Sequence, residues 1–220
     1  MKIKKIIGLL FATTCFLISC DYVNQPYTVP GPNGCTVVEP TFIPDTSPVR
    51  KVLVEDFTGH FCGVCPQAHT VIDNLLSNSF YSERMVAIAH HSSYAGPFTD
   101  PWSTVGNPTL QFVYDFRNPI SSDLDYKYNG AGYPSGLVNR KDFGGGPLVG
   151  HTTWQGYTDD ILDTPQQLDI QIKPFYDPVE KSICSYYYVE ALENLIGNFK
   201  ISLYLTEDSI IQWQKNELTI

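Results

Sequence analysis

The sequence has few basic residues. Lys and Arg together number 14 against 23 Asp and Glu, which gives the 220-residue chain a formal net charge of −9 at pH 7. Because nucleic acids present closely spaced phosphates, a protein that binds them needs a basic surface. The shortage of positive charge therefore argues against nucleic acid as a partner. The hydrophobic content of 43% is ordinary, so the length suits one globular domain, with or without a smaller second piece.

The sequence also lacks an apolar run of comfortable membrane-spanning length. After the basic start MKIKK, the apolar run IIGLLFATTCFLIS covers residues 6–19, whereas a helix needs about 20 residues to cross a bilayer. The run ends in LISC, so the small residue Ser19 directly precedes Cys20, and a polar, Pro-rich stretch follows. This pattern resembles the lipobox of bacterial lipoproteins, which implies that residues 1–19 are a signal peptide and that Cys20 is lipidated. An ordinary secretory signal or a short membrane anchor is the alternative interpretation.

Export would place the cysteines in an oxidising compartment, where disulfides form. Two of the six belong to the signal and the lipidation site, two form a close pair and two stand apart: respectively Cys15 and Cys20, Cys62 and Cys65, and Cys35 and Cys184. A Cys35–Cys184 disulfide would tie the N-terminal segment to the C-terminal part. Two unpaired buried thiols are the alternative, and the sequence leaves both open.

The first folded unit is predicted after a Pro-rich segment. Residues 20–50 have few large apolar clusters and indicate a lipidated tether, or alternatively an arm packed on the domain. The apolar run at 52–54 predicts a buried strand, and CPQAHTVIDNLLSN at 65–78 has apolar residues at helical spacing. RMVAIAHH at 84–91 predicts a second buried strand. Strand, helix and strand in this order predict a βαβ unit with parallel pairing.

The next segment is rich in Pro, Gly, Ser and Asn, with one predicted helix around TLQFVYDFRN at 109–118. HTTWQGYTDDILDT at 151–164 predicts a further helix. The glycine run GGGP at 144–147 does not indicate a phosphate loop, because no helix with a lysine follows it. A hairpin turn is the better interpretation of those glycines.

The period of the apolar residues changes near residue 165. LDIQIKPF and NFKISLYLTED alternate apolar and polar residues, and SICSYYYVEAL between them indicates a further strand. Strands joined by short turns predict an antiparallel β-sandwich-like segment over 166–220, after a domain at 51–165. With a fourth strand at the end of the chain, the sandwich has fewer strands than usual, which favours a truncated protein or a fragment.

The candidate chemistry lies in VLVEDFTGHFCGVCPQAH, where two residues separate Cys62 from Cys65. This spacing suits a small disulfide loop, with Cys62 at the predicted start of a helix and Cys65 one turn later on the same face. Unpaired backbone N–H groups and the helix dipole favour a thiolate at the first sulfur there. His60, two residues earlier, would stabilise that thiolate when protonated, or is simply an exposed loop histidine.

Three interpretations of the pair are open. A zinc site normally needs a second cysteine or histidine pair, and the sequence has no second C-x-x-C. A purely structural disulfide in so short a loop constrains the unfolded chain little. A redox-active dithiol is favoured, because the motif follows a buried strand and opens a helix in a βαβ unit.

The strand, the dithiol, the helix after it and a later GYPS before another strand resemble the thioredoxin fold. The resemblance implies that Asp56, six residues before the first cysteine, is a buried proton acceptor for Cys65. It also implies that Pro134 is a cis-proline facing the dithiol and that the backbone of Tyr133 pairs with substrate. The sequence departs from thioredoxin in Phe61, which replaces a tryptophan, in Gly-Val between the cysteines and in a long insertion before Pro134. These departures leave the redox potential and the substrate open.

A further resemblance concerns the whole chain. The stretches VLVEDFTGHFCGVCPQAH, AIAHHSS and GYPSGLVNRKDF, with the alternating strands and LYLTEDSIIQWQ after them, resemble the twenty-eight-kilodalton outer-membrane protein family (Omp-related lipoproteins) of Bacteroidetes-type bacteria, over about residues 48–220. This resemblance implies a thioredoxin-like domain followed by a β-sandwich, and a lipid anchor in the outer membrane. It leaves the membrane face open and brings no defined activity.

We therefore expect an α/β protein that carries out thiol–disulfide exchange on extracytoplasmic proteins, with no cofactor and no metal. Cys62 would be the nucleophile, Cys65 the resolving thiol and Asp56 the proton relay, while Tyr133 and Pro134 would form the substrate-docking edge. The alternative is a non-enzymatic surface binding or adhesion lipoprotein. In that case the Cys62–Cys65 disulfide is structural and the C-terminal segment is the working part.

Overall fold

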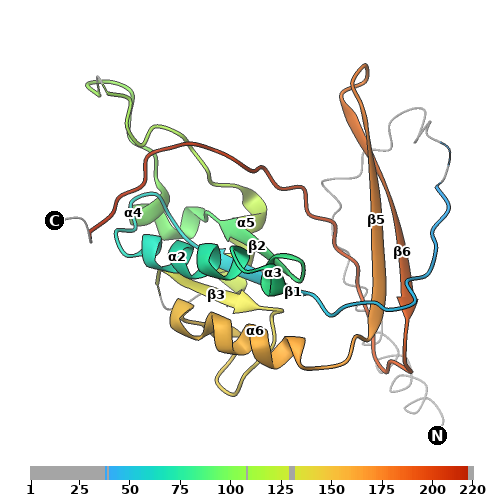
Figure 1. Cartoon of the computed structure of the whole chain (residues 1–220). Helices are drawn as coiled ribbons and strands as arrows, with labels where there is room; N and C mark the ends of the chain where they lie inside the picture. The colour runs from blue at the N-terminus through green and yellow to red at the C-terminus, as the bar shows by residue number, and fades with distance from the viewer. Residues whose placement is uncertain (1–37, 39, 108, 129–131, 218–220) are drawn as a thin grey trace, which may run out of the picture. The chain divides into compact units, whose positions relative to one another are not determined.

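The computed structural model describes residues 38, 40–107, 109–128 and 132–217 (Figure 1). The described residues divide into two compact units: those within 42–171 together with 188–217, and those up to Thr41 together with Ile172–Tyr187. The predicted signal peptide, the lipidation site Cys20 and most of the predicted tether lie outside the described residues. The division at residues 19, 50 and 165 therefore stays a prediction.

The larger unit is built on a four-stranded sheet in the order β2-β1-β3-β4. β1 (Val52–Phe57) pairs in parallel with β2 (Met85–His90) and antiparallel with β3 (Ser135–Val138), which in turn pairs with β4 (Leu148–Val149). α2 (Cys65–Leu76) connects β1 to β2, so the predicted parallel βαβ unit is confirmed. β1 is an interior strand whose two edges are both paired, and its residues on both faces are buried, apart from the half-buried Leu53.

Short helices complete this unit. They are α3 (Ser79–Ser82), η2 (Ser93–Ala95), α4 (Gly96–Thr99), α5 (Pro119–Tyr128), η3 (His151–Thr153) and α6 (Trp154–Leu162). α6 confirms the predicted helix at 151–164. The predicted helix at 109–118 is wrong, because the backbone at Leu110 and Phe112 has φ values of 51° and 56°, which a right-handed helix excludes.

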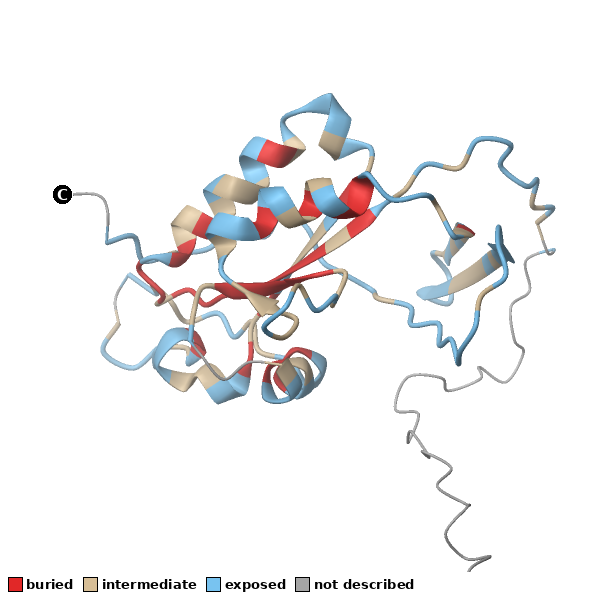
Figure 2. Ribbon diagram, turned by 90° about the horizontal axis from the view of Figure 1, so that it is seen from below, coloured by how far each residue is buried: buried red, intermediate tan, exposed pale blue. Residues whose placement is uncertain are grey.

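Strand alternation gives β1 two different faces. One face packs against α2 and α6 in a hydrophobic core that includes Val52, Val54, Ala68, Leu75, Trp154 and Ile161. Figure 2 shows the buried strands lying between helices on either side. Asp56 follows Val52 and Val54 in the alternation and so faces α2, whereas Glu55 faces the opposite side.

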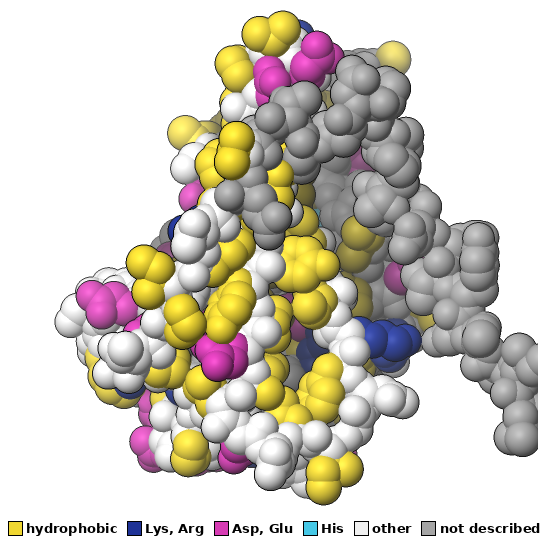
Figure 3. Space-filling model, turned by 90° about the vertical axis from the view of Figure 1, so that its right-hand side faces the viewer, with side chains coloured by type: hydrophobic (Ala, Val, Ile, Leu, Met, Phe, Trp, Pro, Cys, Tyr) yellow, Lys and Arg dark blue, Asp and Glu magenta, His cyan; other side chains and the backbone are white. Residues whose placement is uncertain are grey.

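β5 (Leu168–Asp177) and β6 (Ser182–Ala191) form a separate two-stranded sheet. Ile170 and Ile172, two apolar residues of the alternating stretch LDIQIKPF, are 57% and 53% exposed. Figure 3 shows hydrophobic side chains on the surface that is turned toward the viewer. The predicted strand at 198–208 is absent, since residues 198–216 have no regular secondary structure. The described residues thus provide no second sheet for the hairpin, and the β-sandwich stays a prediction.

Two findings concern the predicted export. Cys184 lies in β6 and is disulfide-bonded. Because Cys35 lies outside the described residues, its pairing with Cys184 stays a prediction. Among the residues that the structure describes, none of the helices is both long and apolar enough to span a membrane.

Candidate functional site

Cys62 and Cys65 form a disulfide at the N-terminal end of α2, with an S–S distance of 2.04 Å. Cys65 is the first residue of the helix, and Pro66 follows it in the first turn, where its missing N–H costs no helical hydrogen bond. The N–H of Cys62 donates to the carbonyl oxygen of Gly59 at 2.9 Å, which holds the first cysteine just before the helix. The predicted helix start at Cys62 is thus three residues early, and Cys62 lies near the positive end of the helix dipole.

A groove of ≈ 760 Å³ opens beside the disulfide. Cys62 and Tyr133 both line it, although they come from distant parts of the sequence. The peptide bond between Tyr133 and Pro134 is cis. Other lining residues come from the insertion after β2: Gly96, Pro97, Phe98, Pro101, Trp102 and Phe112. The fold therefore brings the dithiol and the predicted docking residue to one groove.

The insertion between β2 and β3 supplies an aromatic wall of this groove. Phe61 stacks on Phe112 with ring centroids 4.6 Å apart, and Trp102 contacts both rings at 5.1 and 5.3 Å. Gly59 lies so close to the insertion that a Cβ would be 2.4 Å from the carbonyl oxygen of Phe98. Only glycine fits there, so the insertion packs tightly on the dithiol loop. Sequence reasoning missed this wall, for which the density of aromatic residues was the available signal.

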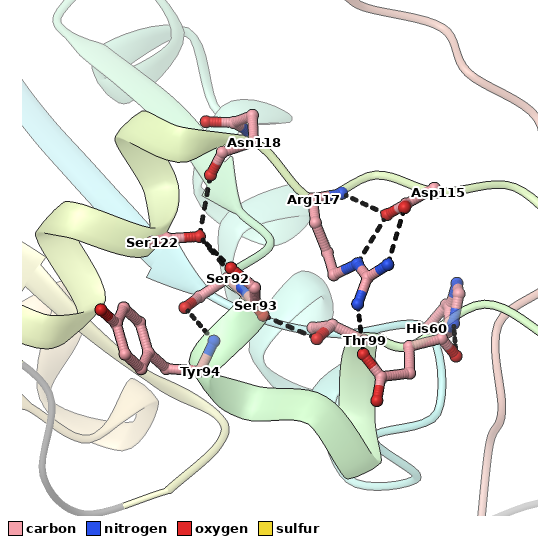
Figure 4. Close-up of polar contacts among 10 residues, drawn as sticks. His60, Ser92, Ser93, Tyr94, Thr99, Asp115, Arg117, Asn118 and Ser122 are labelled. Atoms are coloured by element: carbon pink, nitrogen blue, oxygen red, sulfur yellow. Dashed lines mark hydrogen bonds and ion pairs between the residues drawn. The ribbon is translucent and has the colours of Figure 1, made fainter.

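His60 is buried within that packing. It is 2% exposed, lies among phenylalanine rings and has its Nε2 3.3 Å from the carbonyl oxygen of Asp100. The carboxylates of Asp100 and Asp115 pair with Arg117 nearby (Figure 4). Burial lowers the pKa of His60, although the Asp100 carbonyl and Asp115 oppose this effect. A neutral imidazole is therefore favoured, and His60 is neither an exposed histidine nor a cation placed to stabilise the Cys62 thiolate.

Asp56 is 1% exposed and lies under α2. Its carboxylate has no aligned hydrogen bond from any described residue, but Nε2 of His69 lies 3.3 Å from Oδ2, an ion-pair distance. The same nitrogen is 3.1 Å from Oγ1 of Thr58. Burial raises the pKa of Asp56, with His69 opposing, and the Asp56 carboxylate raises the pKa of His69. His69 follows Cys65 by four residues, so both side chains lie on one face of α2.

Glu55 faces the other side of the sheet, and its charge is paired. Nε and Nη2 of Arg140 donate to its two carboxylate oxygens at 2.6 and 2.7 Å, and Nε2 of His90 is 3.2 Å from Oε1. Burial alone would raise the pKa of Glu55, but the hydrogen bonds from Arg140 and His90 lower it to about 2. Glu55 is therefore part of a structural ion pair, whereas Asp56 is the carboxylate on the α2 side.

A C-terminal strap, residues 213–217, runs along the dithiol loop, residues 59–63 (Figure 1). Alternate strap residues donate their backbone N–H groups to loop carbonyls, as an extended strand does. The bonds are Lys215 N to His60 O at 2.8 Å, Glu217 N to Gly63 O at 3.0 Å, and the Gln214 side-chain amide to Gly59 O at 3.2 Å and Cys62 O at 3.1 Å. The strap therefore covers part of the loop that carries Cys62.

Replacing Lys215 with proline is expected to uncover the dithiol. Proline removes the N–H that donates to His60, and a single hydrogen bond contributes about 0.5–1.5 kcal/mol. We expect glutathione to reduce the Cys62–Cys65 disulfide about 2- to 10-fold faster in this variant, measured by quenched alkylation. Lys215→Ala keeps the N–H and is the matched control. Equal rates in Lys215→Pro, Lys215→Ala and the unchanged protein would show that the strap does not shield the dithiol.

The order of elements defines the class of this unit. A parallel βαβ unit is followed by a helix, an antiparallel strand pair and a closing helix, with a C-x-x-C disulfide at the start of the first helix and a cis-proline loop beside it. This arrangement is a thioredoxin-like fold. Within residues 38, 40–107, 109–128 and 132–217, no three or more His, Cys, Asp or Glu side chains are grouped to hold a metal ion.

Solved structures are similar to this chain at low sequence identity. HBP35 of Porphyromonas gingivalis is 17% identical with a TM-score of 0.39, over 59% of this chain and 38% of HBP35. A protein from Agrobacterium tumefaciens is 16% identical with a TM-score of 0.40, over 67% of this chain and 74% of its own. The oxidoreductase NmDsbA1 from N. meningitidis is 17% identical with a TM-score of 0.31, over 54% and 87%. No family model and no curated protein matches the sequence.

Proposed function

We propose that this protein is a thiol–disulfide oxidoreductase that acts on extracytoplasmic proteins. The observation that carries the proposal is the position of the Cys62–Cys65 disulfide, at the N-terminal end of α2 and in one groove with Tyr133. A thiolate formed at this place is stabilised by the helix dipole, and Cys62, although buried, lines the groove in which a substrate would bind.

The residues take distinct parts in the proposed reaction. Cys62 lines the groove, so its thiolate attacks a substrate disulfide, forming a mixed disulfide and releasing one substrate thiolate. Cys65 then attacks the Cys62 sulfur, which releases the second substrate thiolate and leaves the dithiol oxidised. Asp56 accepts the proton that Cys65 loses before this attack. The backbone of Tyr133, next to Pro134, docks the substrate chain.

We propose further that the protein belongs to the Omp-related lipoproteins and is anchored in the outer membrane through a lipid on Cys20. The basic start, the short apolar run and LISC support the anchor. Protein thiols and disulfides outside the cytoplasm would be its substrates. The anchor would keep the dithiol in a compartment where disulfides persist.

The redox equilibrium of the Cys62–Cys65 pair tests the proposed activity. A soluble form beginning after Cys20 would be titrated with glutathione and with dithiothreitol, then quenched by thiol alkylation. We expect reversible titration between roughly −270 and −120 mV, the range of thiol–disulfide oxidoreductases. A potential below about −300 mV would mark a structural disulfide and reject the proposal.

A second candidate is a binding or adhesion protein with a structural Cys62–Cys65 disulfide. The exposed apolar residues of the β5–β6 hairpin favour it, because such a surface suits a partner. Besides the titration, the cysteine variants separate the two candidates: a binding protein retains its function in Cys62→Ser and Cys65→Ser, whereas an oxidoreductase does not.

A further inference from the structure

The proposed reaction needs a route by which the proton of Cys65 leaves the buried dithiol and reaches solvent. Cys65 is fully buried, and Asp56, its proposed proton acceptor, is 1% exposed. A carboxyl group enclosed in this way cannot exchange its proton directly with water. Repeated turnover therefore needs a group that contacts both Asp56 and solvent.

His69 is such a group by position. Its Nε2 lies 3.3 Å from Oδ2 of Asp56, while the side chain is 38% exposed. The hydroxyl of Thr58, itself buried, is 3.1 Å from the same nitrogen and holds the ring toward the carboxylate. His69 and Cys65 lie one turn apart on α2, so the imidazole and the second sulfur are both on the face that covers Asp56.

The charges around this pair leave His69 as the partner in contact. His90 of β2 and His151 of η3 act on the Asp56 carboxylate only through space, and the Asp56 charge contributes to the raised pKa of Tyr133. The Asp73 carboxylate on α2 raises the pKa of His69, and His69 contributes to the lowered pKa of His91, which follows β2. Of the described residues, His69 alone lies at ion-pair distance from the Asp56 carboxylate.

We infer that His69 is the positioning and proton-transfer residue that links Asp56 to solvent during closure of the Cys62–Cys65 disulfide. This inference rests on the proposed function and deepens it. Cys65 gives its proton to the Asp56 carboxylate, and its thiolate attacks the Cys62 sulfur of the mixed disulfide, releasing the substrate thiolate. The pair starts with its one proton on His69, and the imidazolium gives this proton to water once Asp56 has taken up the proton from Cys65. Protonated Asp56 then passes its proton to the now neutral His69, and the pair returns to its starting state.

The coupling has a physical basis in the two environments. Burial disfavours the Asp56 carboxylate, and the imidazolium of His69 favours it. The ionised Asp56 carboxylate favours the imidazolium in turn, and the Asp73 carboxylate adds a smaller effect. The pair therefore tends to hold one proton over a wide pH range, and its titrations belong to both residues together. An Asp56–His69 pair that holds one proton near the Cys65 thiol can accept a second proton and then release it to water.

Closure can be followed without a protein substrate. Reduced protein mixed with 5,5′-dithiobis(2-nitrobenzoate) forms a mixed disulfide on Cys62, and attack by Cys65 then releases a second coloured thiolate, which stopped-flow absorbance records from pH 5 to 9. We expect His69→Gln to slow this second release about tenfold near pH 7. The difference should shrink at high pH, where Cys65 loses its proton to hydroxide.

Two further variants separate proton transfer from charge or packing. His69→Lys keeps a cation beside Asp56 but retains its proton throughout this pH range, so it should also lose the wild-type inflection. If His69 acted only by its charge, lysine would restore the wild-type profile. His151→Gln removes a histidine that acts on Asp56 without contact and should leave the profile unchanged.

Carbon-13 NMR of labelled aspartate and histidine in the unchanged reduced protein gives a readout that needs no variant. Asp56 and His69 should report the same two titration steps, and independent titration would overturn the inference. An identical closure profile in His69→Gln and the unchanged protein would also overturn it. The proposed function fails separately, through a potential below about −300 mV, and closure that still depends on His69 would then support the proton route without the proposed activity.

Discussion

Replacing Cys62 with serine is expected to reduce thiol–disulfide exchange to the uncatalysed rate. Cys62 lines the groove, while Cys65 lies in the first turn of α2, so only the first sulfur is placed to attack a substrate. Serine has no sulfur, so it can form neither a thiolate that attacks the substrate nor the mixed disulfide that Cys65 resolves, and neither half of the reaction proceeds. Turnover of a fluorescent disulfide, such as labelled oxidised glutathione, would measure the loss of exchange activity.

The Cys65→Ser variant should behave differently, because it can start the reaction but cannot complete it. Cys62 would form a mixed disulfide with its partner, and the complex would persist on a non-reducing gel and disappear with dithiothreitol. Cys184→Ser, which alters a cysteine outside the groove, is the control and should retain exchange. Full activity in Cys62→Ser, or stable adducts formed equally by Cys62→Ser and Cys65→Ser, would contradict the assigned roles.

The part of the fold nearest the dithiol could be predicted from the sequence because its signals are local. The apolar run before the motif, the helical spacing after it and the second apolar run predict β1, α2 and β2, and all three are present. The groove could not be predicted in this way. Its wall depends on contacts between residues far apart in the chain, such as Phe61 with Phe112, and the local spacing of apolar residues does not predict such contacts.

The assignment of the two neighbouring carboxylates shows the same limit. Sequence position suggests Asp56 by likeness, but Glu55 is adjacent, and only the sheet shows that they face opposite sides. The sequence does not single out His69, because its closeness to Asp56 depends on how α2 crosses β1. For the C-terminal segment, the sequence predicted a regular element that the structure does not have. Its alternation predicts a strand over 198–208, yet the described residues provide no neighbouring strand for it, and alternation alone does not form a sheet.

Replacing Arg140 with methionine is expected to destabilise the protein by about 3–5 kcal/mol, because it leaves the Glu55 carboxylate buried without its cation. Glu55 is fully buried, and Arg140 donates to both of its oxygens and to the hydroxyl of Tyr204. Arg117→Met is a matched control. Its side chain is 28% exposed against 30% for Arg140, but its partners Asp115 and Asp100 are 47% and 59% exposed, so we expect a loss of about 0–1 kcal/mol. Urea unfolding at pH 7 measures all three proteins.

The pH dependence of the same variants distinguishes a buried charge from lost packing. The pKa of Glu55 is about 2 in the folded protein, below its ordinary value of 4.5, so the unfolded chain takes up the proton first as the pH falls. The stabilisation by this pair is therefore complete above about pH 4.5 and is lost toward pH 2. In Arg140→Met, burial without the guanidinium should raise the pKa of Glu55, so acidification favours the folded variant. The gap in unfolding free energy between the variant and the unchanged protein therefore closes.

The double variant Glu55→Gln/Arg140→Met should recover much of the lost unfolding free energy at pH 7, because no charge remains buried. A gap that stays constant from pH 7 to pH 3, or a loss no larger than in Arg117→Met, would mean that Arg140 contributes through its aliphatic packing and not through the carboxylate.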